Sequence, residues 1–529
     1  MYDYLIQNAR ILNGSGSAAV SGDVAVAGGT IAAVGCLPGA PARHVIDARG
    51  RFLAPGFIDI HRHADAVLFS PEFGKAELAQ GLTTVINGNC GLSLAPVDGP
   101  YRVDTLLYLA PIVGGLPESR TFPNLSGYCA QAGRIPLRLN AGMLVGMGTL
   151  RACVAGFRDG DLSDDEYRQL YHLLERALSG GAMGVSLGLG YAPECFYSTD
   201  GLIRALEPLR DSGVPVAVHM RQEGDGVVEA LKEMLFVARA LRTPVEISHL
   251  KAIGKRNWNR AVPEMLALLD QARQDGLDIA CDVYPYPAGS TQLIHVLPPE
   301  FQAGGLGALT EALRDPAARA EMRRRMETGR DFENISLLVG FENIRPTSLH
   351  LPENQPLEGK TLAEIADIRR QEPYDALFDL LASEHCAVSM IDYITSEEDI
   401  DAILRAPFSS VISDATYPTD GMPHPRVYGT FVHLLEHFVK ERGALTASQA
   451  VHKMTQKPAR VLHLDGKGVL AAGMDADINV FDLEKLHQPG TYENPRCLAV
   501  GMDYVLVDGA VAVEKGRCTG VKAGRILRR

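Results

Sequence analysis

The middle of the chain alternates short apolar strands with amphipathic helices, and this alternation constrains the fold more than any other feature. Helical patterns cover residues 163–178, 227–241 and 262–274. Apolar strand patterns cover residues 214–218, 244–248 and 278–282. Repeated βα units predict a parallel sheet with crossover helices. A run of this length favours a (β/α)8 TIM-like barrel. A doubly wound open sheet is the runner-up, but no glycine-rich dinucleotide fingerprint follows any strand.

The two chain ends have a different sequence pattern, in which short strands alternate with turns. The N-terminal strand patterns are residues 4–12, 23–27 and 30–34, and the C-terminal ones are residues 477–481, 504–507 and 511–513. We expect a small β-sandwich domain built from both termini, residues 1–54 plus 468–529. Two unrelated appendages are the alternative. The α/β barrel then occupies residues 55–467.

Residues 291–380 break the βα rhythm, since they are rich in Arg, Glu, Pro and helical patterns. We expect an insertion or lid around 291–350, beside the barrel mouth. Two alternatives are a long barrel helix with irregular loops and an oligomer contact.

Composition indicates the cellular compartment and the kinds of partner that we expect for this protein. The net charge of −13 argues against nonspecific nucleic-acid binding. The start of the chain has no signal-peptide pattern, and no apolar stretch is long enough to span a bilayer. The nine cysteines are scattered without paired spacings, which favours reduced thiols. We therefore expect a cytoplasmic protein that acts on a small molecule, without nucleic-acid or membrane partners, as a monomer or a homo-oligomer.

Metal-competent side chains stand at the ends of five predicted strands. His61 and His63 follow the apolar run 52–60, and side chains at i and i+2 of a strand point the same way. The other four are Cys90, His219, His249 and Asp414. Because barrel enzymes place their sites at the carboxyl ends of the strands, we expect these six side chains to converge on a metal ion.

The ligand types indicate which metal is bound and what it does. Imidazoles with one thiolate and one carboxylate favour zinc over magnesium or calcium. Zinc with an open position activates a water molecule. Asp414 can act as general base toward that water and then as acid toward a leaving nitrogen. This chemistry describes hydrolysis of an amide-like bond.

Longer motifs extend over nearly the whole chain. They are residues 55–63 (PGFIDIHRH), 88–91 (GNCG), 181–186 (GAMGVS), 188–191 (GLGY), 219–224 (HMRQEG), 247–251 (ISHLK), 282–286 (DVYPY), 413–414 (SD), 423–426 (PHPR) and 473–477 (GMDAD). With them the chain resembles the amidohydrolase superfamily and, within it, the N-acyl-D-amino-acid deacylase (D-aminoacylase) family. The HxH pair and the last Asp are general to the superfamily, whereas the Asn-Cys-Gly and Tyr-Pro-Tyr segments are specific to the deacylases.

The resemblance implies a division of the metal ligands. Cys90, His219 and His249 would hold a tight zinc, while His61, His63 and Asp414 would form a weaker or vacant second position. In this family a cysteine takes the role of the carbamylated lysine that bridges two metals elsewhere in the superfamily. The activity implied is zinc-dependent hydrolysis of N-acyl-D-amino acids to a carboxylate and a free D-amino acid.

The resemblance also implies substrate contacts. Lys251, Tyr284 and Ser290 would hold the substrate carboxylate, and Tyr191 would help to polarise the scissile carbonyl. Arg221 and Arg426 are further candidates for carboxylate binding. For Arg221 the alternative is an ion pair with Glu223 or another barrel acid.

Three positions depart from the family pattern: Arg62, Ala64 and Met147, where a small residue or Thr, an acid and a histidine are usual. Arg62 beside a metal would disfavour a second cation. The alternative activity is a cyclic amidase that opens hydantoin-like or dihydroorotate-like rings, although such enzymes carry a bridging lysine that we do not find. A catalytically dead scaffold is the third hypothesis, and the complete set of ligands argues against it.

Overall fold

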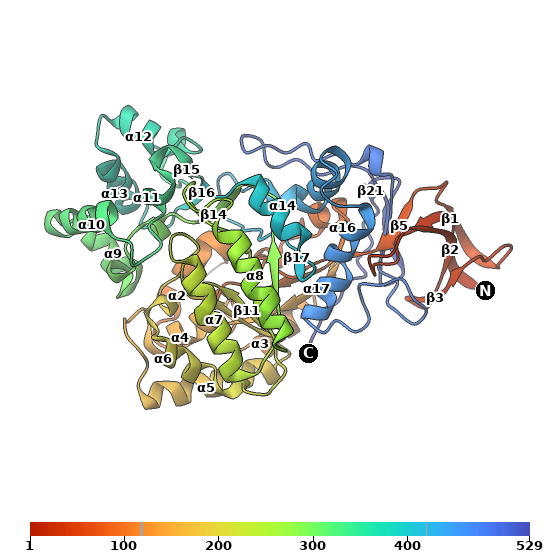
Figure 1. Ribbon diagram of the computed structural model, residues 1–529, viewed down its shortest axis with the longest axis horizontal. Coiled ribbons are helices and arrows are strands. Elements are labelled where there is room, and N and C mark those ends of the chain that lie inside the picture. The colour runs from red at the N-terminus through yellow and green to blue at the C-terminus, as the bar shows by residue number, and fades with distance from the viewer. Residues whose placement is uncertain (117–119, 419) are drawn as a thin grey trace.

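The two chain ends form one sheet in the computed structural model, which describes residues 1–116, 120–418 and 420–529 (Figure 1). Its strands are β1 (Tyr2–Ile11), β2 (Val20–Ala27), β3 (Thr30–Gly35), β4 (Ala42–Asp47), β5 (Phe52–Pro55), β18 (Ile478–Phe481), β19 (Met502–Val507), β20 (Ala510–Glu514) and β21 (Arg517–Cys518). The order is β21-β20-β19-β18-β5-β1-β2-β3, with β4 beside β1. The ends meet where β18 runs antiparallel to β5. The pairing joins all nine strands into one sheet rather than two.

The predicted parallel strands are present, but they form two sheets. One contains β6 (Phe57–Asp59), β7 (Leu82–Asn87) and β8 (Asn140–Met143). The other contains, in sequence order, β9 (Val145–Gly146), β10 (Val185–Gly188), β11 (Val216–His219), β12 (Val245–Ile247), β13 (Ile279–Val283) and β17 (Ser409–Val411). All neighbouring pairs within these two sheets are parallel.

The expected closed ladder of eight strands is therefore not continuous in the described chain. Between β6 and β17 a side chain replaces a main-chain partner, since the Ser413 backbone N–H donates to the Asp59 carboxylate at 3.1 Å. Main-chain bonds resume just beyond, where the Asp414 N–H donates to the His61 carbonyl at 2.9 Å. The two sheet edges thus adjoin at the point where the chain turns toward the site.

The three predicted barrel helices are α5 (Asp164–Ser179), α7 (Val227–Leu241) and α8 (Ala261–Gln274). Helix α5 begins with a capping box, in which Ser163 accepts from the Glu166 N–H and Glu166 accepts from the Ser163 N–H. Its buried residues, Tyr167, Leu170, Leu174 and Ala177, recur at helical spacing and cover one face. Amphipathic patterning thus predicts these helices because only one stripe of each is buried.

Residues 288–393, between β13 and β17, differ from the βα units, and their helices lie at one end of the molecule (Figure 1). Strands β14 (Ala288–Gln292), β15 (Ile344–Pro346) and β16 (Ser389–Tyr393) form an antiparallel sheet in the order β14-β16-β15. The accompanying helices are α9 (Gly305–Ala312), α10 (Pro316–Thr328), α11 (Ile335–Val339), α12 (Leu362–Arg369) and α13 (Pro373–Ser383). The remaining α-helices of the described residues are α1 (Lys75–Ala79), α2 (Arg102–Val113), α3 (Leu125–Ala132), α4 (Met147–Ala155), α6 (Thr199–Ala205), α14 (Glu397–Arg405), α15 (Arg426–His433), α16 (Ala447–Met454) and α17 (Gln456–Val461).

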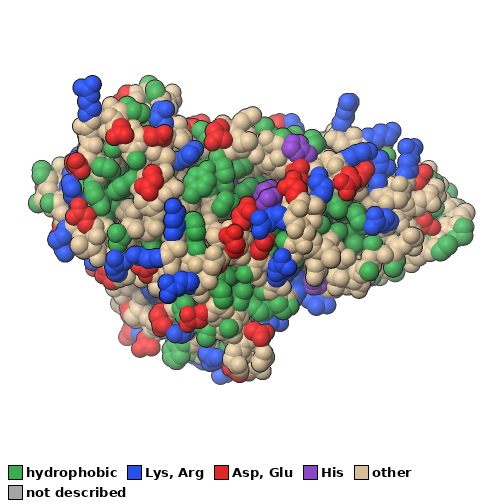
Figure 2. Space-filling model, turned by 45° about the horizontal axis from the view of Figure 1, so that its top comes forward, with side chains coloured by type: hydrophobic (Ala, Val, Ile, Leu, Met, Phe, Trp, Pro, Cys, Tyr) green, Lys and Arg blue, Asp and Glu red, His purple; other side chains and the backbone are tan. Residues whose placement is uncertain are grey.

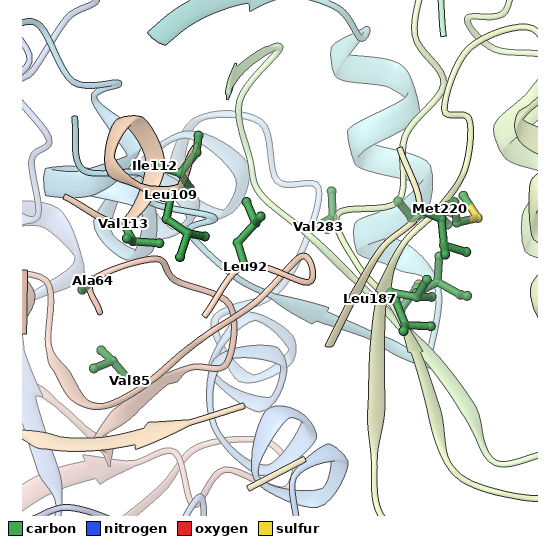
Figure 3. Packing of buried hydrophobic residues seen from close by; sticks show 14 of the residues in the cluster. Ala64, Val85, Leu92, Leu109, Ile112, Val113, Leu187, Met220 and Val283 are labelled. Carbon is green, nitrogen blue, oxygen red and sulfur yellow. The ribbon is translucent and has the colours of Figure 1, made fainter. Parts of the chain in front are cut away.

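Apolar packing surrounds the strand ends. In Figure 3, Leu109 and Ile112 of α2 lie near Leu92, while Leu187 of β10 and Val283 of β13 come from the parallel strands.

Figure 2 shows acidic and basic side chains interspersed over the face in view. Among the described helices, none has both the length and the apolar character needed to cross a bilayer.

Candidate active site

The six predicted metal ligands come together at the carboxyl ends of the parallel strands. His61 and His63 follow β6, Cys90 follows β7, and His219 is the last residue of β11. His249 and Asp414 come shortly after β12 and β17. All six side chains are buried. The convergence predicted from the strand ends is therefore present.

The ligand atoms form two clusters that share Cys90. One cluster joins Cys90 with His219 and His249, and the other joins Cys90 with His61, His63 and Asp414; within each, the ligand atoms lie within 4.8 Å of one another. The Cys90 sulfur lies 3.2 Å from His61 Nε2 and 3.5 Å from His249 Nε2. The Asp414 Oδ1 lies 3.3 Å from Nε2 of both His61 and His63.

The charges and donor atoms of this cluster fit a metal ion. Burial raises the pKa of the Cys90 thiol, but the charge of His61 and hydrogen bonds from nearby imidazoles hold the pKa well below its ordinary value. His219 Nδ1 and His249 Nε2 face each other at 3.0 Å, so two imidazole nitrogens and a thiolate point to one place. A soft thiolate with imidazoles is a donor set for zinc or a similar transition metal.

The backbone at three ligands adopts the left-handed conformation that favours glycine. The φ angles are 53° at Cys90, 36° at His249 and 50° at Asp414. Such a conformation costs a non-glycine residue about 1 kcal/mol or more, and it clusters at functional sites. Each of the three residues therefore lies at a sharp turn two or three residues after its strand, and the turns bring their side chains together.

Two buried acids, Asp282 and Glu223, contact the predicted ligands, and the sequence predicted neither of them at the metal site. Asp282 accepts a hydrogen bond from the His249 backbone N–H, and its Oδ2 lies 3.6 Å from His61 Nδ1. Glu223 Oε1 lies 2.9 Å from His249 Nδ1, and Glu223 Oε2 lies 2.5 Å from Lys251 Nζ. Carboxylates that bind the outer nitrogen of a metal-bound imidazole fix its tautomer and orientation. Asp282 ends the predicted strand 278–282, so the strand-end argument extends to it.

A cavity of about 480 Å³, counting its open mouth, lies beside the ligands. Four of the predicted substrate contacts line it: Tyr191, Lys251, Tyr284 and Ser290. The Tyr191 hydroxyl bonds to Thr291 Oγ1 at 2.8 Å, and the ring lies 4.5 Å from that of His219. Lys251 Nζ lies 5.9 Å from the centre of the Tyr284 ring. The predicted metal ligands and the predicted substrate contacts therefore face the same cavity.

The two remaining candidates, both arginines, lie outside the cavity lining. Arg426 is fully buried behind the wall, where it contacts Asp414 Oδ2 at 3.0 Å and donates to the Ser290 carbonyl at 3.0 Å. Arg221 forms a bidentate ion pair with Glu233, with both contacts at 2.9 Å. Arg221 does not line this cavity. It forms the ion pair that we considered as the alternative, with Glu233 rather than Glu223 as its partner.

Arg62 points away from the metal ligands. Side chains alternate along the chain here, so His61 and His63 share one side and Arg62 takes the other. Its guanidinium contacts Asp59 at 3.1 Å and Glu77 at 2.8 Å, and it also donates to the Tyr417 hydroxyl. Two carboxylates neutralise the charge. We expected Arg62 to disfavour a second cation, but these two carboxylates balance its positive charge.

Three further titratable residues that line the cavity were not predicted from the sequence: His295, Glu333 and Asp392. All three belong to the segment between β13 and β17, for which the sequence predicted no strand ends. Lys251 is the one lysine among the described residues that line the cavity, and it pairs with Glu223. No described lysine therefore occupies the bridging place that Cys90 takes, which argues against a cyclic amidase.

Buried thiolate, imidazole and carboxylate ligands at the carboxyl ends of parallel strands define a metal-dependent hydrolase. Residues 44–112 and 350–513 match the model of the amidohydrolase family. D-aminoacylase of Alcaligenes xylosoxydans xylosoxydans is 33% identical over 100% of this chain and 98% of its own length. N-acyl-D-glutamate deacylase of the same organism is 34% identical over 100% and 96%. The chain belongs to the amidohydrolase superfamily and, within it, to the D-aminoacylase family.

A solved structure agrees with this assignment. The N-acyl-D-glutamate deacylase of Bordetella bronchiseptica, complexed with zinc and a phosphonate inhibitor that mimics the tetrahedral intermediate, superimposes with a TM-score of 0.84. The two chains are 31% identical, and the match covers 100% of each.

Proposed function

We propose that this protein hydrolyses the amide bond of N-acyl-D-amino acids, releasing a carboxylate and a free D-amino acid, with zinc as its metal. The observation that carries the proposal is the Cys90 sulfur at the junction of two imidazole clusters, facing a wall that holds Lys251, Tyr284 and Ser290. The names of the relatives, D-aminoacylase and N-acyl-D-glutamate deacylase, support the amide substrate and its D configuration.

The metal-binding residues divide into two groups. Cys90, His219 and His249 would hold the principal zinc, since the thiolate and two imidazoles are the softest donors present. His61, His63 and Asp414 would hold a weaker second ion. When bound, zinc polarises a carbonyl and makes water a good nucleophile at neutral pH.

The remaining residues bind the substrate and move protons. Lys251, Tyr284 and Ser290 hold the α-carboxylate, which orients the amide toward the ligands. The Tyr191 hydroxyl donates to the carbonyl oxygen as negative charge develops there. Asp414 accepts the proton of the attacking water and passes it to the departing nitrogen. Arg426 positions Asp414 through the contact at 3.0 Å.

We also propose that the two parallel sheets together form a (β/α)8 barrel. Only Leu144 separates β8 from β9, so these two strands count as one passage of the chain and the total becomes eight. Residues 1–54 and 468–529 would form the terminal β domain beside residues 55–467. The insertion around 291–350 would cover the barrel mouth, because Glu333 and Ile335 line the cavity.

The test is an assay of the zinc-loaded protein with N-acetyl-D-leucine, N-acetyl-L-leucine and the cyclic amide dihydrouracil. We expect free amine from the D substrate, at a rate about 100-fold or more above the L substrate, and no ring opening. An Asp414→Asn variant purified in parallel controls for contaminating acylases. Ring opening without amine release from either enantiomer would contradict the proposal.

A further inference from the structure

Two carboxylates in the cavity wall, those of Glu333 and Asp392, form no ion pair with a lysine or arginine among the described residues. Glu333 is 5% exposed, and neither of its carboxylate oxygens has a hydrogen-bond partner among the described residues. Asp392 is 2% exposed, and no described basic side chain lies within 4.0 Å of its carboxylate, although the charges of Lys251 and His295 act on it from farther away. Both residues line the cavity that holds the metal ligands. Burying a carboxylate without a partner is costly, so these groups need an explanation.

The other two acids that line the cavity are neutralised by the protein. Glu223 contacts Lys251 at 2.5 Å, and Asp414 contacts Arg426 at 3.0 Å. No described arginine lines the cavity, and its lysine is already paired. Among the acids that line the cavity, Glu333 and Asp392 are therefore the two that no described lysine or arginine neutralises. His295 lies 3.7 Å from Glu333, so a protonated imidazole would offset one of these charges but not both.

The two carboxylates flank the region where the substrate would lie. Asp392 pairs with Gly289 across β16 and β14, next to Ser290. A Cβ atom at Gly289 would lie 2.9 Å from Asp392 Oδ1 and 3.4 Å from the Tyr284 hydroxyl oxygen. Asp392 is thus beside the proposed carboxylate contacts.

Glu333 stands on the side of the metal ligands. It is next to His295, whose ring is 4.7 Å from Tyr191 and 6.1 Å from His219. Glu333 therefore lies nearer the proposed position of the scissile carbonyl, and Asp392 nearer that of the α-carboxylate. The carbon that bears the D side chain connects these two groups of the substrate.

We propose that Glu333 and Asp392 form a subsite for a positively charged group of the substrate, carried either by a basic D side chain or by an ammonium on the acyl arm. The inference rests on the proposed deacylase function. A cation at this place would supply the missing ion pairs, whereas an acidic side chain would meet two like charges. Burial raises the pKa of Asp392 to about 6, so its carboxylate is mostly ionised at pH 7.

Two matched substrate pairs test the subsite at pH 7, where an α-amino group is mostly protonated. N-acetyl-D-lysine against N-acetyl-D-norleucine isolates a charge on the side chain, and glycyl-D-leucine against N-acetyl-D-leucine isolates a charge on the acyl arm. We expect kcat/KM to favour the charged member of at least one pair by about tenfold or more. In a Glu333→Gln/Asp392→Asn double variant that ratio should fall to about one.

The ratio compares two substrates on the same protein, so a general loss of folding or metal cancels. The Glu342→Gln variant, which removes an exposed carboxylate of the same segment, should keep the wild-type ratio. Equal rates within both pairs, a preference for N-acetyl-D-glutamate, or an unchanged ratio in the double variant would overturn the subsite and leave the deacylase function standing. Failure to hydrolyse any N-acyl-D-amino acid would overturn both.

Discussion

At the scale of single residues, the site depends on close approaches that leave no room for a larger side chain. Gly190 packs against two imidazoles of the site, and a Cβ atom there would lie 2.8 Å from His219 Nε2 and 3.3 Å from His295 Cε1. Both distances are shorter than ordinary carbon contacts. The absence of a side chain at Gly190 therefore sets the position of the His219 ring.

A Gly190→Ala substitution should displace His219 and weaken metal binding without unfolding the protein. We expect metal content to fall and kcat/KM to drop about tenfold or more, since misplacing a ligand by a fraction of an ångström impairs a site of this kind. Metal analysis and circular dichroism measure the two effects. The Gly307→Ala variant is the control, because nothing lies within 4 Å of a Cβ atom at Gly307. Wild-type metal content in Gly190→Ala would refute the steric argument.

At the scale of elements, helix α15 packs on the Tyr-Pro-Tyr segment through a partly buried histidine, His433. The ring of His433 stacks on Tyr286 with centroids 4.6 Å apart, and it also stacks on His437. Burial, with the charge of His437, lowers the pKa of His433 to about 4, although Glu436 and Glu441 act in the opposite direction. The folded state therefore binds a proton at His433 less readily than the unfolded chain does.

This shift predicts a loss of stability in acid. Between pH 6.5 and about 4 the unfolded chain holds the His433 proton and the folded protein does not, so the free energy of unfolding falls as the pH falls. A His433→Phe variant should lose less stability than the wild type over this window, by up to about 3 kcal/mol. Denaturant unfolding at pH 7 and pH 4 measures the difference. Parallel losses in both proteins would contradict the shift.

The elements also explain which parts of the site could be predicted from the sequence. His61, Cys90, His219 and their fellow ligands were predictable because each follows a recognisable apolar strand, and parallel strands bring their carboxyl ends together. Helices α5 and α7 were predictable because one face of each is apolar. Asp392 and Glu333 were not, since β16 pairs antiparallel with β14 and Glu333 precedes a short helix far along the chain. Their meeting depends on long-range packing that leaves no local pattern.

At the scale of the whole molecule, the chain passes from the terminal sheet to the parallel strands within a few residues. The apolar run 52–60 looks continuous in sequence, yet β5 pairs with β1 and β18 while β6 pairs with β7. Gly56 separates the two strands, and a Cβ atom there would lie 2.2 Å from Thr83 Oγ1. One glycine thus joins the terminal sheet to the strand that leads to His61 and His63.

The proposed barrel, with a terminal sheet at one end and an insertion at the other, gives each part a separate task. The strand ends supply the proposed metal ligands, and the insertion supplies Glu333 to the cavity wall. This division predicts that substrate preference and metal binding can be changed independently, by substitutions in different segments.

The most direct test of the account measures metal content and turnover together in Cys90→Ala and Asp414→Asn variants. Cys90→Ala should lose both the metal and the deacylase activity, because it removes the ligand that both clusters share. Asp414→Asn should retain about one metal ion per chain, yet lose turnover about 100-fold or more, as expected for removal of a general base. Stoichiometric metal in Cys90→Ala, or near wild-type turnover in Asp414→Asn, would contradict the account.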